Sequence, residues 1–190
     1  KIAAHQDSYF KLFFCLCFDT PLFKQIYLQE TKNLESLLLK QVSRSYYPNI
    51  NKLSKKDTSL LRIGFVSGDL RIHPVAYFLE STLKELSKSK NLTLIAYYTQ
   101  HFEDYKTIQF KSLFACWHNV ASLTHSQSAK QIYNDDIDIL IDLTGYTAKT
   151  GIDIFAWHPA KIQVSWLGYY ASTGLECMDY FLTDPISITA

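Results

Sequence analysis

Short apolar runs alternate with helical patterns along most of the chain. Strands are predicted at Leu61–Val66, Leu92–Tyr98, Trp117–Val120, Ile137–Leu143, Ile162–Leu167 and Tyr180–Thr183. Helices are predicted between them, one beginning at Pro74 and others over residues 102–114, 126–133 and 151–157. Near-continuous apolar strands separated by helices are typical of a parallel sheet covered on both faces. The pattern therefore predicts an α/β fold, a Rossmann-like doubly wound parallel sheet with right-handed crossovers.

The first part of the chain has a different pattern. Residues 1 to about 47 predict helices, with Thr20 as a cap and Pro21 at the first helical position. An amphipathic stripe follows at helical spacing, made of Phe23, Ile26, Tyr27, Leu34, Leu37 and Leu38. The polar stretch Pro48–Ser59 is predicted to be a linker. We therefore divide the chain into a helical lead-in and linker, residues 1–57, and an α/β lobe, residues 58–190.

Composition narrows the class of protein. The chain has 190 residues, 47% of them hydrophobic, and a net charge of +1, so it is neither disordered nor suited to a nucleic-acid partner. No apolar run approaches the roughly 20 residues of a membrane span, and no secretory signal is present. Four cysteines without a C-x-x-C pair indicate reduced thiols and a cytoplasmic protein. Because the chain starts at Lys1 and its one methionine is Met178, we expect an excerpt of a longer protein.

Ligands of such sheets bind at the carboxyl ends of the strands. That rule selects the loops 67–74, 99–104, 144–151 and 168–174. The first loop lacks the G-x-G-x-x-G pattern of a dinucleotide site, since only Gly64 and Gly68 are present. The sequence also lacks a P-loop, an H-E-x-x-H step and metal-ligand histidine spacing. We therefore expect no metal and no resident cofactor.

Several side chains in these loops remain open to two interpretations. His73, directly before Pro74, either acts as a base at the ligand crevice or only caps the helix. Tyr146 and Thr147 offer hydroxyl groups suited to a sugar, or Gly145 only makes the turn and Tyr146 only packs. Gly168 allows close approach of a ligand to the backbone, or belongs to an ordinary strand exit.

Four blocks in order carry a resemblance to a known family. They are LRIGFVSGDLRIHPVAYFLE (61–80), DILIDLTGYTA (138–148), FAWHPAKIQVSWLGY (155–169) and TGLECMDYFLTDP (173–185). Together they resemble the protein O-linked N-acetylglucosamine transferase and SPINDLY family, which are inverting glycosyltransferases of the two-lobed GT-B fold. The resemblance implies the amino-terminal catalytic lobe of a metal-independent enzyme. It also implies a carboxy-terminal lobe, tetratricopeptide repeats, a UDP-GlcNAc donor and a protein acceptor with Ser or Thr hydroxyls.

The family's functional positions transfer residue by residue. Its histidine, proposed as a base, matches His73, and its L-G-Y step at the sugar matches Leu167, Gly168 and Tyr169. The G-Y-T step matches Gly145, Tyr146 and Thr147, and an acidic residue after the second strand matches Asp104. Tyr146, Tyr169 and Tyr170 are expected to be open to water.

One departure keeps other functions open. Gly151 stands where the family usually has Arg. The chain is then alternatively a degenerate lobe that binds protein without catalysis, or part of a SPINDLY-like O-fucosyltransferase that uses GDP-fucose. Residues 1–190 alone are expected to transfer no sugar, because the groups that stabilise the nucleotide are expected in the other lobe.

Overall fold

The computed structural model describes residues 8–9, 11–13, 21–42, 46, 60–147 and 150–184. The predicted linker at Pro48–Ser59 and the predicted cap at Thr20 lie outside these residues, as do Cys15 and Cys17. Of the cysteines within them, Cys116 is exposed and Cys177 is buried, and both are free thiols.

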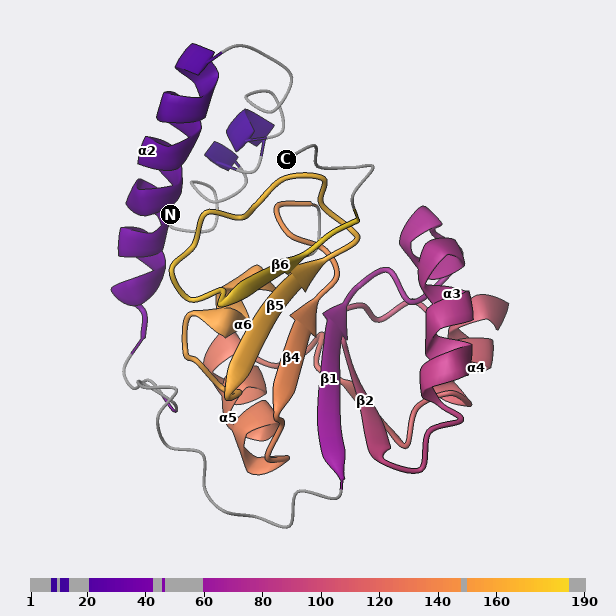
Figure 1. The fold of residues 1–190 in the computed structure, drawn as a ribbon. Helices are drawn as coiled ribbons and strands as arrows, with labels where there is room; N and C mark the ends of the chain where they lie inside the picture. Colours follow the sequence, from indigo (N-terminus) through magenta and orange to yellow (C-terminus); the bar gives the residue numbers. More distant parts are fainter. Residues whose placement is uncertain are drawn as a thin grey trace.

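The strands form one six-stranded sheet in the order β3-β2-β1-β4-β5-β6, and every neighbouring pair is parallel. The prediction of a doubly wound parallel sheet is thus confirmed (Figure 1). Their bounds are β1 (Leu61–Ser67), β2 (Leu92–Tyr98), β3 (Cys116–Asn119), β4 (Ile139–Asp142), β5 (Ile162–Trp166) and β6 (Tyr180–Leu182).

Alternate residues of the central strands belong to two separate apolar cores, one on each face of the sheet. Ile63 and Phe65 of β1 belong to one apolar cluster, whereas Val66 belongs to the other. Leu94 and Ile95 of β2 divide in the same way. This period of two explains why both faces of the sheet are apolar and why each face needs a cover of helices.

Helices α3 (Pro74–Leu86) and α4 (Tyr105–Lys111) cover one face, and α5 (His125–Asn134) and α6 (Ile152–Phe155) cover the other (Figure 1). Asp104 and Thr124 begin α4 and α5 with reciprocal capping boxes. Helix α4 is shorter than the predicted 102–114, because the Asp104 cap starts it and Ser112 ends it. Strand β4 is likewise shorter than the predicted Ile137–Leu143.

Helix α2 (Pro21–Leu39) is the described part of the predicted helical extension, together with the helical residues 8–9 and 11–13. It lies along the β6 side of the sheet (Figure 1). Tyr27, Leu34 and Leu38 on its buried face join the same apolar cluster as α5 and α6. These three residues of the predicted stripe therefore join the core, whereas Ile26 is 37% exposed and does not.

The strand order reverses between β1 and β4. The chain leaves β1 toward β2 and β3 on one side, and leaves β4 toward β5 and β6 on the other. At such a switch point the connecting loops diverge and open a crevice at the carboxyl ends of the strands. The loops after β1 and β4 therefore border the place where a ligand is expected.

Candidate functional site

His73 lies at the end of the loop that follows β1, as the N-cap of α3. Its Nδ1 accepts a hydrogen bond from the Val75 backbone N–H at 3.3 Å. Its Nε2 lies 3.7 Å from Oδ1 of Asp69, a carboxylate that is only 6% exposed. The side chain of His73 is 34% exposed, so it reaches solvent at the carboxyl end of the sheet.

These contacts select one tautomer of His73. A neutral imidazole has one donor nitrogen and one acceptor nitrogen. Because Nδ1 accepts from Val75, the ring proton belongs on Nε2, where the Asp69 carboxylate also favours it. His73 thus does cap the helix, and what it offers to the crevice in this arrangement is an N–H donor.

Asp69 itself is held in place by its neighbours. Its backbone N–H donates to Ser67 Oγ at 2.9 Å. Burial raises the pKa of the Asp69 carboxyl, while the charges of His73 and Arg71 act in the opposite direction. The sequence analysis did not select Asp69, although an acidic residue two positions after a strand end was a usable signal.

Asp104 braces the backbone beside His73. Its Oδ2 accepts from the Ile72 N–H at 2.7 Å, and its Oδ1 accepts from the Thr107 N–H at 2.9 Å. Burial acts to raise the pKa of Asp104, but the hydrogen bonds from Ile72 and Thr107 outweigh it and the pKa is lowered. The carboxylate is therefore ionised and engaged by the protein, which links the loop after β2 to the loop after β1.

Asp142 shapes the loop that follows β4. Its fully buried carboxylate accepts from Thr144 N–H at 3.1 Å, from Thr144 Oγ1 at 2.9 Å and from Gly145 N–H at 2.7 Å. Burial raises the pKa of Asp142 to about 6, although these hydrogen bonds act to lower it. Gly145 then turns the chain at a φ of +53°, a region that favours glycine. Thr147 closes the turn by donating to Thr144 O at 2.9 Å.

The loops after β4 and β5 touch through their backbones. A Cβ added to Gly168 would lie 1.7 Å from Leu143 O, and one added to Gly145 would lie 2.3 Å from Tyr169 Cβ. Leu167 adopts a φ of +70°, which is uncommon for a side chain other than glycine. The predicted residues of these two loops are therefore brought together.

The first loop joins the same group. Leu167 packs against the apolar cluster that contains Leu70, Val75 and Leu143. The negative charge of Asp69 also acts on Asp142, so the loops after β1 and β4 are close. The loops that carry the residues selected from sequence thus meet at the switch point, and Asp104 is joined to the first of them through its bond from Ile72.

The expectation that Tyr146 and Tyr169 are open to water is wrong. They are 2% and 3% exposed, whereas Tyr170 is 52% exposed as expected. The Tyr146 ring lies 4.5 Å from that of Phe13, and its hydroxyl donates to Thr173 O at 2.6 Å. The helical extension covers both rings, which the sequence analysis treated as a separate segment.

The described residues show neither a metal cluster nor a membrane helix. No three His, Cys, Asp or Glu side chains in that part of the chain are close enough to hold a metal ion. Among the same residues, no helix is both long and apolar enough to cross a bilayer.

Comparison with known proteins identifies the family of this chain. The sequence profile of glycosyl transferase family 41 matches residues 28–190, which is most of the chain. The chain belongs to this family. The resemblance found in the four sequence blocks is thereby confirmed.

Relatives and a solved structure agree with this assignment. A rice protein named as probable UDP-N-acetylglucosamine–peptide N-acetylglucosaminyltransferase SPINDLY is 36% identical over 67% of this chain. The Caenorhabditis elegans UDP-N-acetylglucosamine–peptide N-acetylglucosaminyltransferase is 32% identical over 72% of it. A variant of the Thermobaculum terrenum O-GlcNAc transferase superimposes with a TM-score of 0.76 at 28% identity, over 93% of this chain and 33% of that chain. This chain spans only 14% of the rice protein and 12% of the nematode protein. The family 41 fold is thus shown for one lobe.

Proposed function

We propose that this chain is the amino-terminal lobe of a nucleotide-sugar-dependent protein O-glycosyltransferase. It would transfer N-acetylglucosamine from UDP-GlcNAc to Ser or Thr hydroxyls of a protein, with inversion and without a metal. The observation that carries the proposal is that the loops from the family's sequence blocks meet at the switch point, at the carboxyl ends of β1, β4 and β5. The proposal includes a carboxy-terminal lobe and tetratricopeptide repeats elsewhere in the full-length protein. The free thiols of Cys116 and Cys177 support a cytoplasmic location.

The chemistry sets clear requirements. The acceptor oxygen attacks the anomeric carbon from the face opposite the diphosphate, and the bond from that carbon to the diphosphate oxygen breaks. The hydroxyl proton must be accepted, and the negative charge on the leaving group must be stabilised. His73 is the side chain that we propose acts at the acceptor hydroxyl.

The tautomer of His73 favours a particular division of these tasks. To accept a proton at Nε2, the ring must carry its own proton on Nδ1, which ends the bond from the Val75 N–H. A phosphate oxygen of the donor needs no such change. The contact with Val75 therefore supports a phosphate oxygen of the nucleotide sugar as the alternative proton acceptor. The Nε2–H of His73 would then donate a hydrogen bond that holds the substrate.

Gly151 supports a second candidate function. A Cβ at this position would lie 2.4 Å from Val66 Cγ1, so any larger residue would require the buried Val66 side chain to shift. Restoring the family's arginine would therefore also require repacking around Val66. This is the observation that favours a non-catalytic, protein-binding lobe.

Donor transfer by the full-length protein is the deciding experiment. Purified protein is incubated with radiolabelled UDP-GlcNAc or GDP-fucose and an acceptor protein extract, and residues 1–190 are titrated with UDP-GlcNAc by calorimetry. We expect transfer from UDP-GlcNAc by the full-length protein, with no transfer and only weak binding by residues 1–190. Transfer from GDP-fucose alone would replace the donor in the proposal, and transfer from neither would favour the protein-binding lobe. Micromolar binding by residues 1–190 would move the nucleotide site into this lobe.

A further inference from the structure

Helix α2 presents a stripe of three side chains to the loop between β5 and β6. Tyr27, Thr31 and Glu35 are spaced by four, which places them on one face of the helix. All three are nearly buried, at 8%, 0% and 9% exposure. The stripe therefore faces protein along its whole length.

Each member of the stripe meets a different part of the loop. The Tyr27 hydroxyl donates to Ser172 O, and it lies 3.5 Å from the Tyr169 hydroxyl. At the other end, Glu35 Oε1 accepts from the Glu176 N–H at 2.8 Å. The stripe thus holds the loop backbone at both ends of residues 172–176.

The centre of the stripe fixes how closely helix and loop approach. Gly174 has a φ of +64°, and a Cβ there would lie 2.9 Å from Thr31 Oγ1 and 3.1 Å from Thr31 Cγ2. Residue 174 therefore favours glycine for its backbone conformation and also for its contact with α2. This contact sets the register of the helix along the loop.

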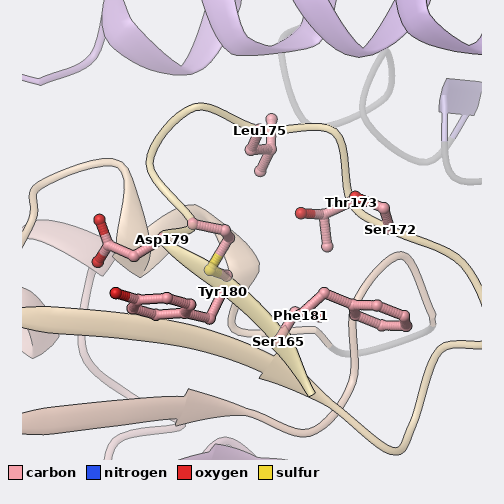
Figure 2. A pocket seen from close by; sticks show the side chains of 8 residues that line it. Ser165, Ser172, Thr173, Leu175, Asp179, Tyr180 and Phe181 are labelled. Atoms are coloured by element: carbon pink, nitrogen blue, oxygen red, sulfur yellow. The ribbon is translucent and has the colours of Figure 1, made fainter. Parts of the chain in front are cut away.

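The opposite side of the loop borders empty space. Figure 2 shows Ser172, Thr173 and Leu175 on the loop between α2, at the top of the view, and β6 below. The cavity between them has a volume of about 210 Å³. It is lined by Ser165, Ser172, Thr173, Leu175, Met178, Asp179, Tyr180 and Phe181. Because the loop borders a cavity on this side, its position above the sheet depends on its contacts with α2, together with the hydrogen bond from the Tyr146 hydroxyl to Thr173 O.

The loop begins with the Leu167-Gly168-Tyr169 step of the candidate site. Gly168 and Tyr169 lie in close contact with the loop after β4, so any displacement of these two residues would also disturb that loop. We propose that Tyr27, Thr31 and Glu35 of α2 are positioning residues that hold the Leu167-Gly168-Tyr169 step in its working geometry. The catalytic consequence rests on the proposed function, whereas the effect on the loop does not.

Hydrogen exchange of the full-length protein tests the positioning itself. Glu35→Ala and Tyr27→Phe each remove the side-chain hydrogen bonding to the loop, whereas Glu35→Gln keeps an acceptor for the Glu176 N–H. The exposed Lys32 on the same helix supplies the matched control, Lys32→Ala. We expect exchange in residues 170–177 to become about ten-fold faster in the first two variants, the factor for about 1.4 kcal/mol. Exchange in α3 should not change, and Glu35→Gln and Lys32→Ala should resemble the parent. Unchanged exchange in both Glu35→Ala and Tyr27→Phe overturns the inference.

Donor kinetics of the same variants test the link to the site. We expect Glu35→Ala to raise the donor KM about ten-fold with a smaller change in kcat, and Glu35→Gln to restore it. Faster loop exchange with an unchanged KM would overturn the positioning role. If the protein transfers no sugar, the proposed function fails, and faster loop exchange in that protein still supports the hold of α2 on the loop.

Discussion

Replacing His73 by asparagine separates its two possible roles. The imidazole caps α3 through the Val75 N–H and also reaches the crevice. Asparagine is among the strongest N-cap residues but has no basic nitrogen. His73→Asn should therefore keep the helix and remove the base, whereas His73→Ala should remove both. Loss of the cap alone is expected to lower the free energy of unfolding by about 1 kcal/mol.

The size of the kinetic effect decides between the roles. Loss of a general base typically lowers turnover about 10²–10⁴-fold. If His73 accepts the proton, both variants of the full-length protein should lose turnover in this range, with donor affinity little changed. Turnover is measured by radiolabel transfer, donor affinity by calorimetry, and the cap by thermal unfolding.

A single result would refute this reasoning. If His73→Asn keeps the parent turnover while His73→Ala loses only stability, then His73 is a helix cap. The proton would then go to the donor phosphate. A loss of about ten-fold or less in turnover, together with a raised KM for the nucleotide sugar, would instead show that His73 acts through the hydrogen bond that its Nε2–H donates to substrate.

Three further predictions concern stability and its pH dependence. Gly168→Ala should lower the free energy of unfolding by about 1–3 kcal/mol in urea titrations, because its Cβ would overlap Leu143 O. Hydrogen bonds from Lys106 and Lys84 lower the pKa of Glu80 to about 2. The contribution of the ionised Glu80 carboxylate to the free energy of unfolding is therefore complete above about pH 4.5 and is lost as the pH falls toward 2. Glu80→Gln should flatten this part of the pH–stability curve. Burial raises the pKa of Asp142 to about 6, so the folded chain binds a proton there more tightly than the unfolded chain. Unfolding free energy should fall as the pH rises from about 4 to 6, and Asp142→Asn should remove that slope.

Much of the fold followed from the sequence because local pattern decides it. The strands that begin at Leu61 and Leu92 are apolar on both faces, and Pro74 starts a helix directly after the loop that follows β1. Side-chain caps were harder to place, since an Asp104 cap and a longer helix produce similar apolar patterns. The boundary proposed at residue 58 stays a prediction, because residues 51–59 lie outside the described part of the chain.

The environment of the site depended on contacts that no local pattern contains. Tyr27 and Ser172 are 145 positions apart, yet they form a hydrogen bond, and the Tyr27 hydroxyl also lies 3.5 Å from that of Tyr169. Without knowledge of such contacts, a tyrosine after a strand end is equally suited to packing or to a sugar. The buried Asp142 was missed for the related reason that its role is to shape a turn from within.

The glycines of the site now have a structural cause that does not require a ligand. At positions 145 and 168 only glycine fits between the loops after β4 and β5, because a Cβ there would overlap atoms of the other loop. A glycine whose missing side chain is explained by packing gives no independent support for a sugar beside it. Contact with the proposed substrate then falls to groups that still reach solvent, and among the predicted site residues His73, with its side chain 34% exposed, is the one that carries a basic ring nitrogen. Because His73 is also a cap, an alanine variant alone cannot measure its chemistry, and the comparison with asparagine becomes the necessary one.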